Sequence, residues 1–141
     1  MIWVGLLGIM IWTFVGQDSL TPRDFVGKNR LLIVVDAGRG EEDWFSKELK
    51  SDLGERKLMV FVYSKGNLIQ TNCTQLVDPN SFIQQVGQKQ AGGKASNWVL
   101  IGLDGGKKYW GVGWPLTKNI FNQIDSMPMR QSEIRRKGKG G

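Results

Sequence analysis

The chain has 141 residues and a formal net charge of +6, with 40% hydrophobic and 23% charged residues, a composition typical of a single globular domain. It contains no histidine and one cysteine, Cys73, which excludes Ser-His-Asp and Cys-His catalysis, a zinc site of Cys and His ligands, a CxxC pair and an intramolecular disulfide. The sequence therefore predicts a domain that uses no cofactor and no metal ion.

The N-terminal segment is apolar, because residues 1–15 carry no charged side chain and the first one is Asp18. This run is shorter than the roughly 20 apolar residues that span a bilayer, but it fits the apolar core of a secretory signal peptide. No Lys or Arg precedes it and no small-x-small cleavage site is obvious near Gly16, so an uncleaved anchor or a buried strand remain alternatives. We expect residues 1–16 to be a signal peptide or N-terminal anchor, the only part in contact with a membrane, and the protein to be extracytoplasmic, either periplasmic or secreted.

The domain itself is placed at residues 17–134, and its first predicted element is a strand at residues 31–36. Residues 31–35 are all apolar, so both faces of this strand must be covered and it belongs in the middle of a sheet. A helix is predicted next. Three acids crowd its first turn, namely Glu41, Glu42 and Asp43. Three apolar residues share one face, namely Phe45, Leu49 and Leu53, and Gly54 is placed just past the end.

The middle of the chain predicts one more strand that is apolar on both faces, at residues 58–63, and Leu68 with Ile69 fits the start of a short edge strand. Asp78 and Pro79 are typical of an N-cap and a first helical residue. The helix that follows is expected to bury three apolar side chains, Phe82, Ile83 and Val86.

The C-terminal part predicts a hairpin and a last helix. Strands at residues 98–103 and 107–112 are separated by Asp104-Gly105, a pair that favours a type I′ turn. Thr117 is expected to cap a helix that ends at Met127, before Pro128. The whole order is βαβ-α-ββ-α, which predicts an α/β fold of the thioredoxin-like type with a mixed central sheet flanked by helices.

A C-terminal box at residues 124–133, I-D-S-M-P-M-R-Q-S-E, resembles the I-D-x-M-P-M-R-x-x-E signature of an uncharacterised thioredoxin-like domain family. Residues 29–32, 55–58 and 100–108 are similar to its N-R-L-L, E-R-D-L and L-I-G-K-D-G-G-x-K segments, with Lys57 and Leu103 as departures. The family occurs as short bacterial proteins and within animal extracellular matrix and sushi-repeat proteins. The resemblance covers about residues 25–134 and implies a thioredoxin-like fold and an extracytoplasmic setting, but no established activity.

The reactive cysteine of thioredoxin-like enzymes follows the first strand, and residues 36–43 here contain none. Dithiol exchange is therefore not expected, and we predict no catalytic residue. The alternative is a thiol-dependent oxidoreductase or peroxidase that uses Cys73, in the segment T-N-C-T. The competing interpretation is an incidental or packed thiol, because no cationic cluster lies near Cys73 in the sequence.

Five residues are candidates for binding: Asp125, Arg130, Glu133, Trp110 and Trp114. The first three belong to the C-terminal box and form either a ligand site, since arginine presents a planar fork to carboxylates, or a structural lock in which Arg130 is paired with an acid. The tryptophans near the hairpin, with Trp98, form either an exposed recognition patch or a cover for the core and the sheet edge. We expect a non-catalytic binding module whose partner is an unknown protein or an envelope or matrix component.

Residues 135–141 form a basic segment without acids and predict a flexible tail. Its four basic residues account for +4 of the net charge of +6, so the rest of the chain carries only +2. Nucleic acid is therefore not the expected partner.

Overall fold

The computed structural model describes residues 19–38, 40, 42–86 and 95–139. The expected signal peptide or anchor at residues 1–16 lies outside these residues. Among the helices of the described ranges, none has the length and apolar character needed to cross a membrane.

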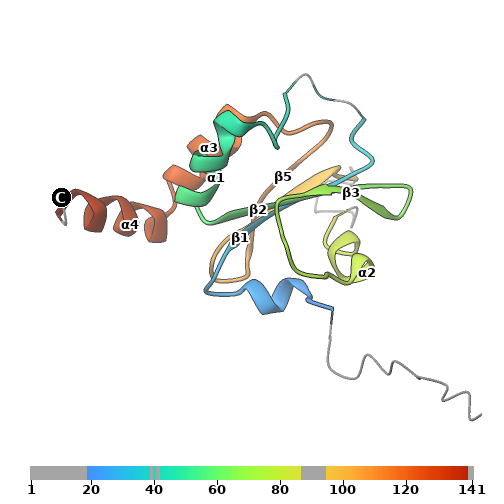
Figure 1. Cartoon of the computed structure of the whole chain (residues 1–141), viewed down its shortest axis with the longest axis horizontal. Helices are drawn as coiled ribbons and strands as arrows, with labels where there is room; N and C mark the ends of the chain where they lie inside the picture. Colours follow the sequence, from blue (N-terminus) through green and yellow to red (C-terminus); the bar gives the residue numbers. More distant parts are fainter. Residues whose placement is uncertain (1–18, 39, 41, 87–94, 140–141) are drawn as a thin grey trace, which may run out of the picture.

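Five strands form one mixed sheet in the order β3-β2-β1-β4-β5 (Figure 1). Strands β1 and β2 are parallel, and the pairs β2–β3, β1–β4 and β4–β5 are antiparallel. The strand bounds are β1 Arg30–Val35, β2 Leu58–Ser64, β3 Asn67–Thr71, β4 Trp98–Ile101 and β5 Lys107–Gly111. The α/β class and the mixed central sheet are confirmed, and the order β2-β1-β4-β5 is consistent with a thioredoxin-like fold to which β3 adds an antiparallel edge.

Helices cover both faces of the sheet (Figure 1). Helices α1 and α3 lie over one face, whereas α2 and the N-terminal turn η1 lie over the other, and α4 extends outward beyond α3. The helix bounds are η1 Pro22–Phe25, η2 Lys47–Leu49, α1 Lys50–Glu55, α2 Pro79–Ile83, α3 Thr117–Asp125 and α4 Pro128–Lys139.

The core is divided by the sheet into two clusters, and β1 contributes to both. Leu32 and Val34 pack with residues of α1 and α3 on one face, whereas Leu31 and Ile33 pack with residues of η1 and α2 on the other. Successive side chains of a strand point to opposite faces, so a central strand covered on both sides needs a continuous apolar run. This is the physical basis of the correct prediction for residues 31–35.

The helix predicted after β1 is much shorter than expected. Helical structure begins only at Lys47, with η2, and α1 ends at Glu55. Trp44 is fully buried, and its Nε1 donates to the Pro115 carbonyl at 3.1 Å. Asp43 accepts a hydrogen bond from the Phe45 N–H at 2.8 Å, a local bond that competes with helix formation. The prediction that Gly54 ends the helix is also wrong, since Gly54 lies within α1.

Two expectations for turns and caps are corrected. The hairpin is present, but the loop spans residues 102–106 and only its Gly105 has a positive φ, 83°, so it is not a type I′ turn. Thr117 is the first residue of α3 rather than its cap. Its N–H donates to Glu42 Oε2 at 2.6 Å, so a carboxylate from a distant loop satisfies the start of this helix.

The basic segment predicted to begin at residue 135 starts as helix, because α4 continues to Lys139. The side chain of Lys137 lies 3.2 Å from Glu55 Oε1, which links this helix to α1. The preceding helix α3 ends at Asp125, two residues before the predicted end at Met127.

Candidate functional site

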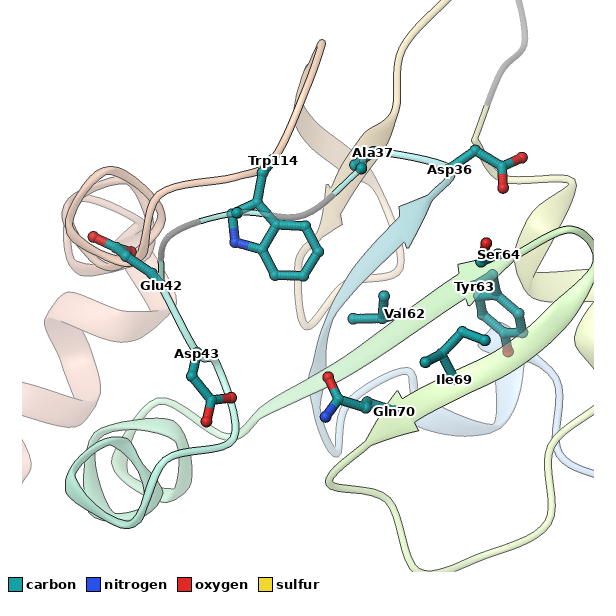
Figure 2. Close-up of a pocket in the computed structure, with 12 residues that line it drawn as sticks. Asp36, Ala37, Glu42, Asp43, Val62, Tyr63, Ser64, Ile69, Gln70 and Trp114 are labelled. Atoms are coloured by element: carbon teal, nitrogen blue, oxygen red, sulfur yellow. The ribbon is translucent and has the colours of Figure 1, made fainter.

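A cleft of about 650 Å³ lies at the carboxyl ends of β1 and β2, and we call it the strand-end cleft. Figure 2 shows Trp114 on one side of this cleft and Ile69 and Gln70 of β3 on the other. Its described lining is partly acidic and partly apolar, including Asp36, Glu42, Asp43, Val62 and Trp114. In open α/β sheets this edge is the usual place for a ligand or for chemistry.

The three acids of the strand-end cleft already bind backbone N–H groups. Asp36 accepts from Lys65 N at 2.9 Å, and Asp43 accepts from its neighbour two residues on. The bond from the Thr117 N–H lowers the pKa of Glu42 below its ordinary value. These acids therefore hold loops in place, and the described residues contain no group of three or more Asp, Glu, Cys or His side chains that could hold a metal ion.

Trp114 closes one side of the strand-end cleft and does not form an open patch. It packs so closely on Gly40 that an added Cβ there would lie 1.8 Å from Trp114 Cδ1. Its indole Nε1 is buried without a hydrogen-bond partner. Trp98 packs in a similar way on Gly111 and so covers the edge, whereas Trp110 is 48% exposed on β5.

Cys73 lies away from the strand-end cleft lining and packs against the core cluster of the η1 and α2 face. Its Sγ donates to the Gln75 carbonyl at 3.6 Å, and its N–H donates to Thr71 Oγ1 at 3.0 Å. Burial, followed by the nearby charge of Asp78, raises the pKa of Tyr63 to about 12. The Tyr63 hydroxyl is therefore a buried neutral group and not a base for the thiol.

Arg130 lies at the centre of a charged network where α1, α3 and α4 meet. Its side chain is only 5% exposed. Its Nε donates to Asp125 Oδ1 at 3.1 Å, and its Nη1 donates to the Glu55 carbonyl at 3.1 Å. Its guanidinium also pairs with Glu55 Oε1 at 3.4 Å and with Glu133 Oε2 at 3.5 Å. The structure thus brings together all three candidate residues of the C-terminal box.

Arg56 completes the clamp around Asp125. Its Nε and Nη2 bind the two carboxylate oxygens at 3.1 and 2.9 Å, and its guanidinium lies 4.3 Å from the centroid of the Phe121 ring. Burial by itself would raise the pKa of Asp125, but hydrogen bonds from Arg56 and then Arg130 outweigh it and lower that pKa. The pairing of Arg130 with Asp125 that a structural lock requires is therefore present.

Arg30, the first residue of β1, belongs to the same charged network. Its side chain is 1% exposed, its Nη1 donates to the Arg56 carbonyl at 2.8 Å, and both Nη atoms lie 3.4 Å from carboxylate oxygens of Glu133. Its Nε is buried and has no hydrogen-bond partner. A buried donor without a partner is unfavourable, because it has lost water and gained nothing in return.

A second cleft, of about 410 Å³, lies between the β4–β5 hairpin and the connection from α3 to α4, and we call it the hairpin cleft. It brings the hairpin and the C-terminal box together, but not through the five candidate residues. Its lining consists of Arg30, Gly102, Leu103, Asp104, Lys108, Tyr109, Ser126, Met127, Pro128 and Met129. The sequence did offer one indication that Arg30 belongs to this cleft. Alternate residues of a strand point to the same face, so Arg30 shares the core face of the buried Leu32 and Val34.

A protein-family model matches most of the chain. The family described as "Domain of unknown function (DUF4174)" matches residues 22–133, and the chain belongs to this family. The matched range includes every strand of the sheet and every residue that lines the hairpin cleft. The comparisons with curated proteins and with solved structures find no match.

Proposed function

We propose that this DUF4174 member is an exported, thioredoxin-like binding module without a redox centre, and that its binding site is the hairpin cleft. One observation carries the proposal: the hairpin and the C-terminal box line the same cleft. Its volume, about 410 Å³, falls in the range of small-ligand sites, which are mostly apolar with a few polar groups. Tyr109 and Met129 are exposed apolar side chains at this cleft and are therefore accessible to a ligand.

The chemistry of the hairpin cleft favours binding over catalysis. Among the described lining residues Ser126 alone carries a hydroxyl of the serine or threonine type, and its Oγ donates to the Gln123 carbonyl at 2.7 Å. A serine nucleophile needs an adjacent base, and the chain has no histidine. The lysine of the lining, Lys108, is paired with Asp104 at 2.7 Å, so its amino group already has a partner.

The alternative function, thiol oxidation or peroxide reduction through Cys73, has less support. The Sγ atom lies 3.6 Å from the Gln75 carbonyl oxygen, to which a thiol donates and which offers no stabilisation to a thiolate. The thiolate is the reactive form, and it is normally stabilised by a cation or a helix N-terminus. Neither a salt bridge nor a hydrogen bond joins Cys73 to a cationic side chain of the described residues.

The binding proposal is tested by nuclear magnetic resonance on the isotope-labelled full chain with a set of chemically diverse small molecules. We expect backbone amide shifts to concentrate on the lining of the hairpin cleft. Met129→Trp fills the cleft and should remove them, whereas Ile134→Trp, on the same helix and also exposed, should not. Shifts confined to the strand-end cleft, or equal effects of the two variants, would refute the proposed site.

Export is tested separately by fusing alkaline phosphatase to the C-terminus of the chain in a bacterial host. The enzyme needs disulfides and is active only outside the cytoplasm. We expect an active fusion with the full chain and an inactive one when residues 1–16 are deleted. Inactivity of the full-length fusion would contradict the extracytoplasmic location.

A further inference from the structure

We propose that the hairpin cleft binds a carboxylate carried on an apolar body, with the carboxylate at the Arg30 end. The inference rests on the proposed function, because it names the ligand class of the same cleft. The carboxylate can belong to a small organic acid or to the C-terminus of a peptide, since both present the same chemistry. Three features of the cleft carry the inference: the donor beneath it, the local charge balance and the apolar lining.

The donor is the Nε–H of Arg30. This side chain lines the hairpin cleft and is only 1% exposed. Its Nη groups bind Glu133 and the Arg56 carbonyl. Its Nε remains without a partner. Arginine donors match carboxylate oxygens in geometry, and a charge-assisted bond is stronger than a neutral one. An oxygen that accepts from Nε would satisfy the one nitrogen of this guanidinium that has no hydrogen-bond partner among the described residues.

The charge balance near Arg30 favours an anion. In the salt-bridge network that the described side chains form here, five cations face four anions, which leaves one surplus positive charge; the members are Arg30, Arg56, Lys57, Arg130, Lys137, Asp52, Glu55, Asp125 and Glu133. The acid in the cleft itself, Asp104, is neutralised by Lys108 at 2.7 Å, and this bond is the first cause of its lowered pKa.

Helix α4 adds to this balance. Pro128 and Met129, its first two residues, line the hairpin cleft, and the helix is 12 residues long. The N-terminal end of a helix carries a partial positive charge and N–H groups without helical acceptors. Together with the buried Arg30 donor, this end of the helix favours a negative group in the cleft.

The remaining lining is apolar and sets the body of the ligand. Leu103 and Met127 are buried, whereas Tyr109 and Met129 are exposed at 37% and 49%. Methionine side chains are flexible and adapt to different apolar shapes. Gly102 also lines the cleft, and an added Cβ there would lie 2.8 Å from Lys108 Cε. A volume of about 410 Å³ suits a branched or aromatic side chain with its carboxylate, and not a long polymer.

The test titrates the isotope-labelled full chain with N-acetylleucine and with the neutral control N-acetylleucinamide. We expect the acid to shift the Arg30 Nε–H resonance and the amides of the cleft lining, and to bind about tenfold or more tightly than the amide, as a charge-assisted hydrogen bond implies. Met129→Trp should abolish this binding and Ile134→Trp should preserve it. A tripeptide ending in leucine, as acid and as amide, shows whether a chain terminus binds more tightly than the free acid.

The outcomes separate the ligand class from the function. Equal binding of acid and amide at the hairpin cleft would overturn the carboxylate while leaving a binding module in place. If other small molecules bound the cleft but N-acetylleucine did not, the carboxylate would also be overturned and the binding module would remain. If no probe bound the cleft, both proposals would be overturned. Arg30→Lys keeps the charge but removes Nε and should reduce the preference for the acid. If that variant does not fold, the Nε–H resonance of the unmodified chain decides the question.

Discussion

Substituting Arg130 tests the charged network at its centre. Arg130→Ala removes contacts to Asp125, Glu55 and Glu133 from a side chain that is 5% exposed. Breaking a buried ion pair costs about 3–5 kcal/mol when a charge is stranded. Here each acid keeps another cation, since Arg56 still binds Asp125, Lys137 still reaches Glu55, and Arg30 still binds Glu133. We therefore expect a smaller loss than that, about 2–3 kcal/mol, or roughly 10 °C in Tm for a domain of this size.

The assay is thermal and urea unfolding of Arg130→Ala beside Arg135→Ala. Arg135 lies on the same helix, is exposed and makes one side-chain hydrogen bond among the described residues, from its Nη2 to Ser132 Oγ at 3.1 Å. Its substitution should change the free energy of unfolding by less than about 0.5 kcal/mol. If the two variants had the same stability, the structural role of Arg130 would be refuted. An unchanged stability with lost ligand binding would instead make Arg130 a binding residue.

Two further predictions concern pH and packing. Because the pKa of Asp125 is lowered in the folded state, its stabilisation is present above the unfolded value of about 3.9 and is lost as the pH falls through the folded value. Asp125→Asn should therefore cost about 1–2 kcal/mol at pH 7, and urea titrations should show this difference shrinking below pH 4; a constant difference would contradict it. Gly40→Ala should cost about 1–3 kcal/mol in denaturation experiments, because a Cβ would lie 1.8 Å from the Trp114 ring. Gly54→Ala, with open space around it in α1, should instead stabilise by about 0.5–1 kcal/mol, and a similar loss in both variants would argue against the close packing of Trp114.

The sheet was predictable from the sequence because a strand covered on both faces requires a continuous apolar run, as in residues 31–35 and 58–63. The helix after β1 was not, because Trp44, inside the range predicted as helix, makes a tertiary contact instead. Trp44 is drawn into the core by burial and by its bond to the Pro115 carbonyl, which is distant in sequence. A periodic pattern cannot reveal such a partner.

The sequence pointed to the hairpin and the C-terminal box, and residues of both segments line the hairpin cleft, but none of the five candidate residues does. The C-terminal box and the hairpin do meet, but the acids of the box bind Arg30 of β1 and Arg56, the residue after α1, and do not line the cleft. Arg30 and Arg56 were missed because their partners lie 103 and 69 residues away in the chain. The start of α3 was missed for the same reason, since Glu42, 75 residues away, supplies its acceptor.

The most direct test of a thioredoxin-like domain that binds without thiol chemistry is thiol-dependent peroxide consumption by the purified full chain, beside Cys73→Ala. The Cys73 thiol donates to a backbone carbonyl, and we expect no turnover above the buffer rate in either protein. Turnover by the unmodified chain that disappears in Cys73→Ala would contradict this account and make the protein a single-cysteine peroxidase.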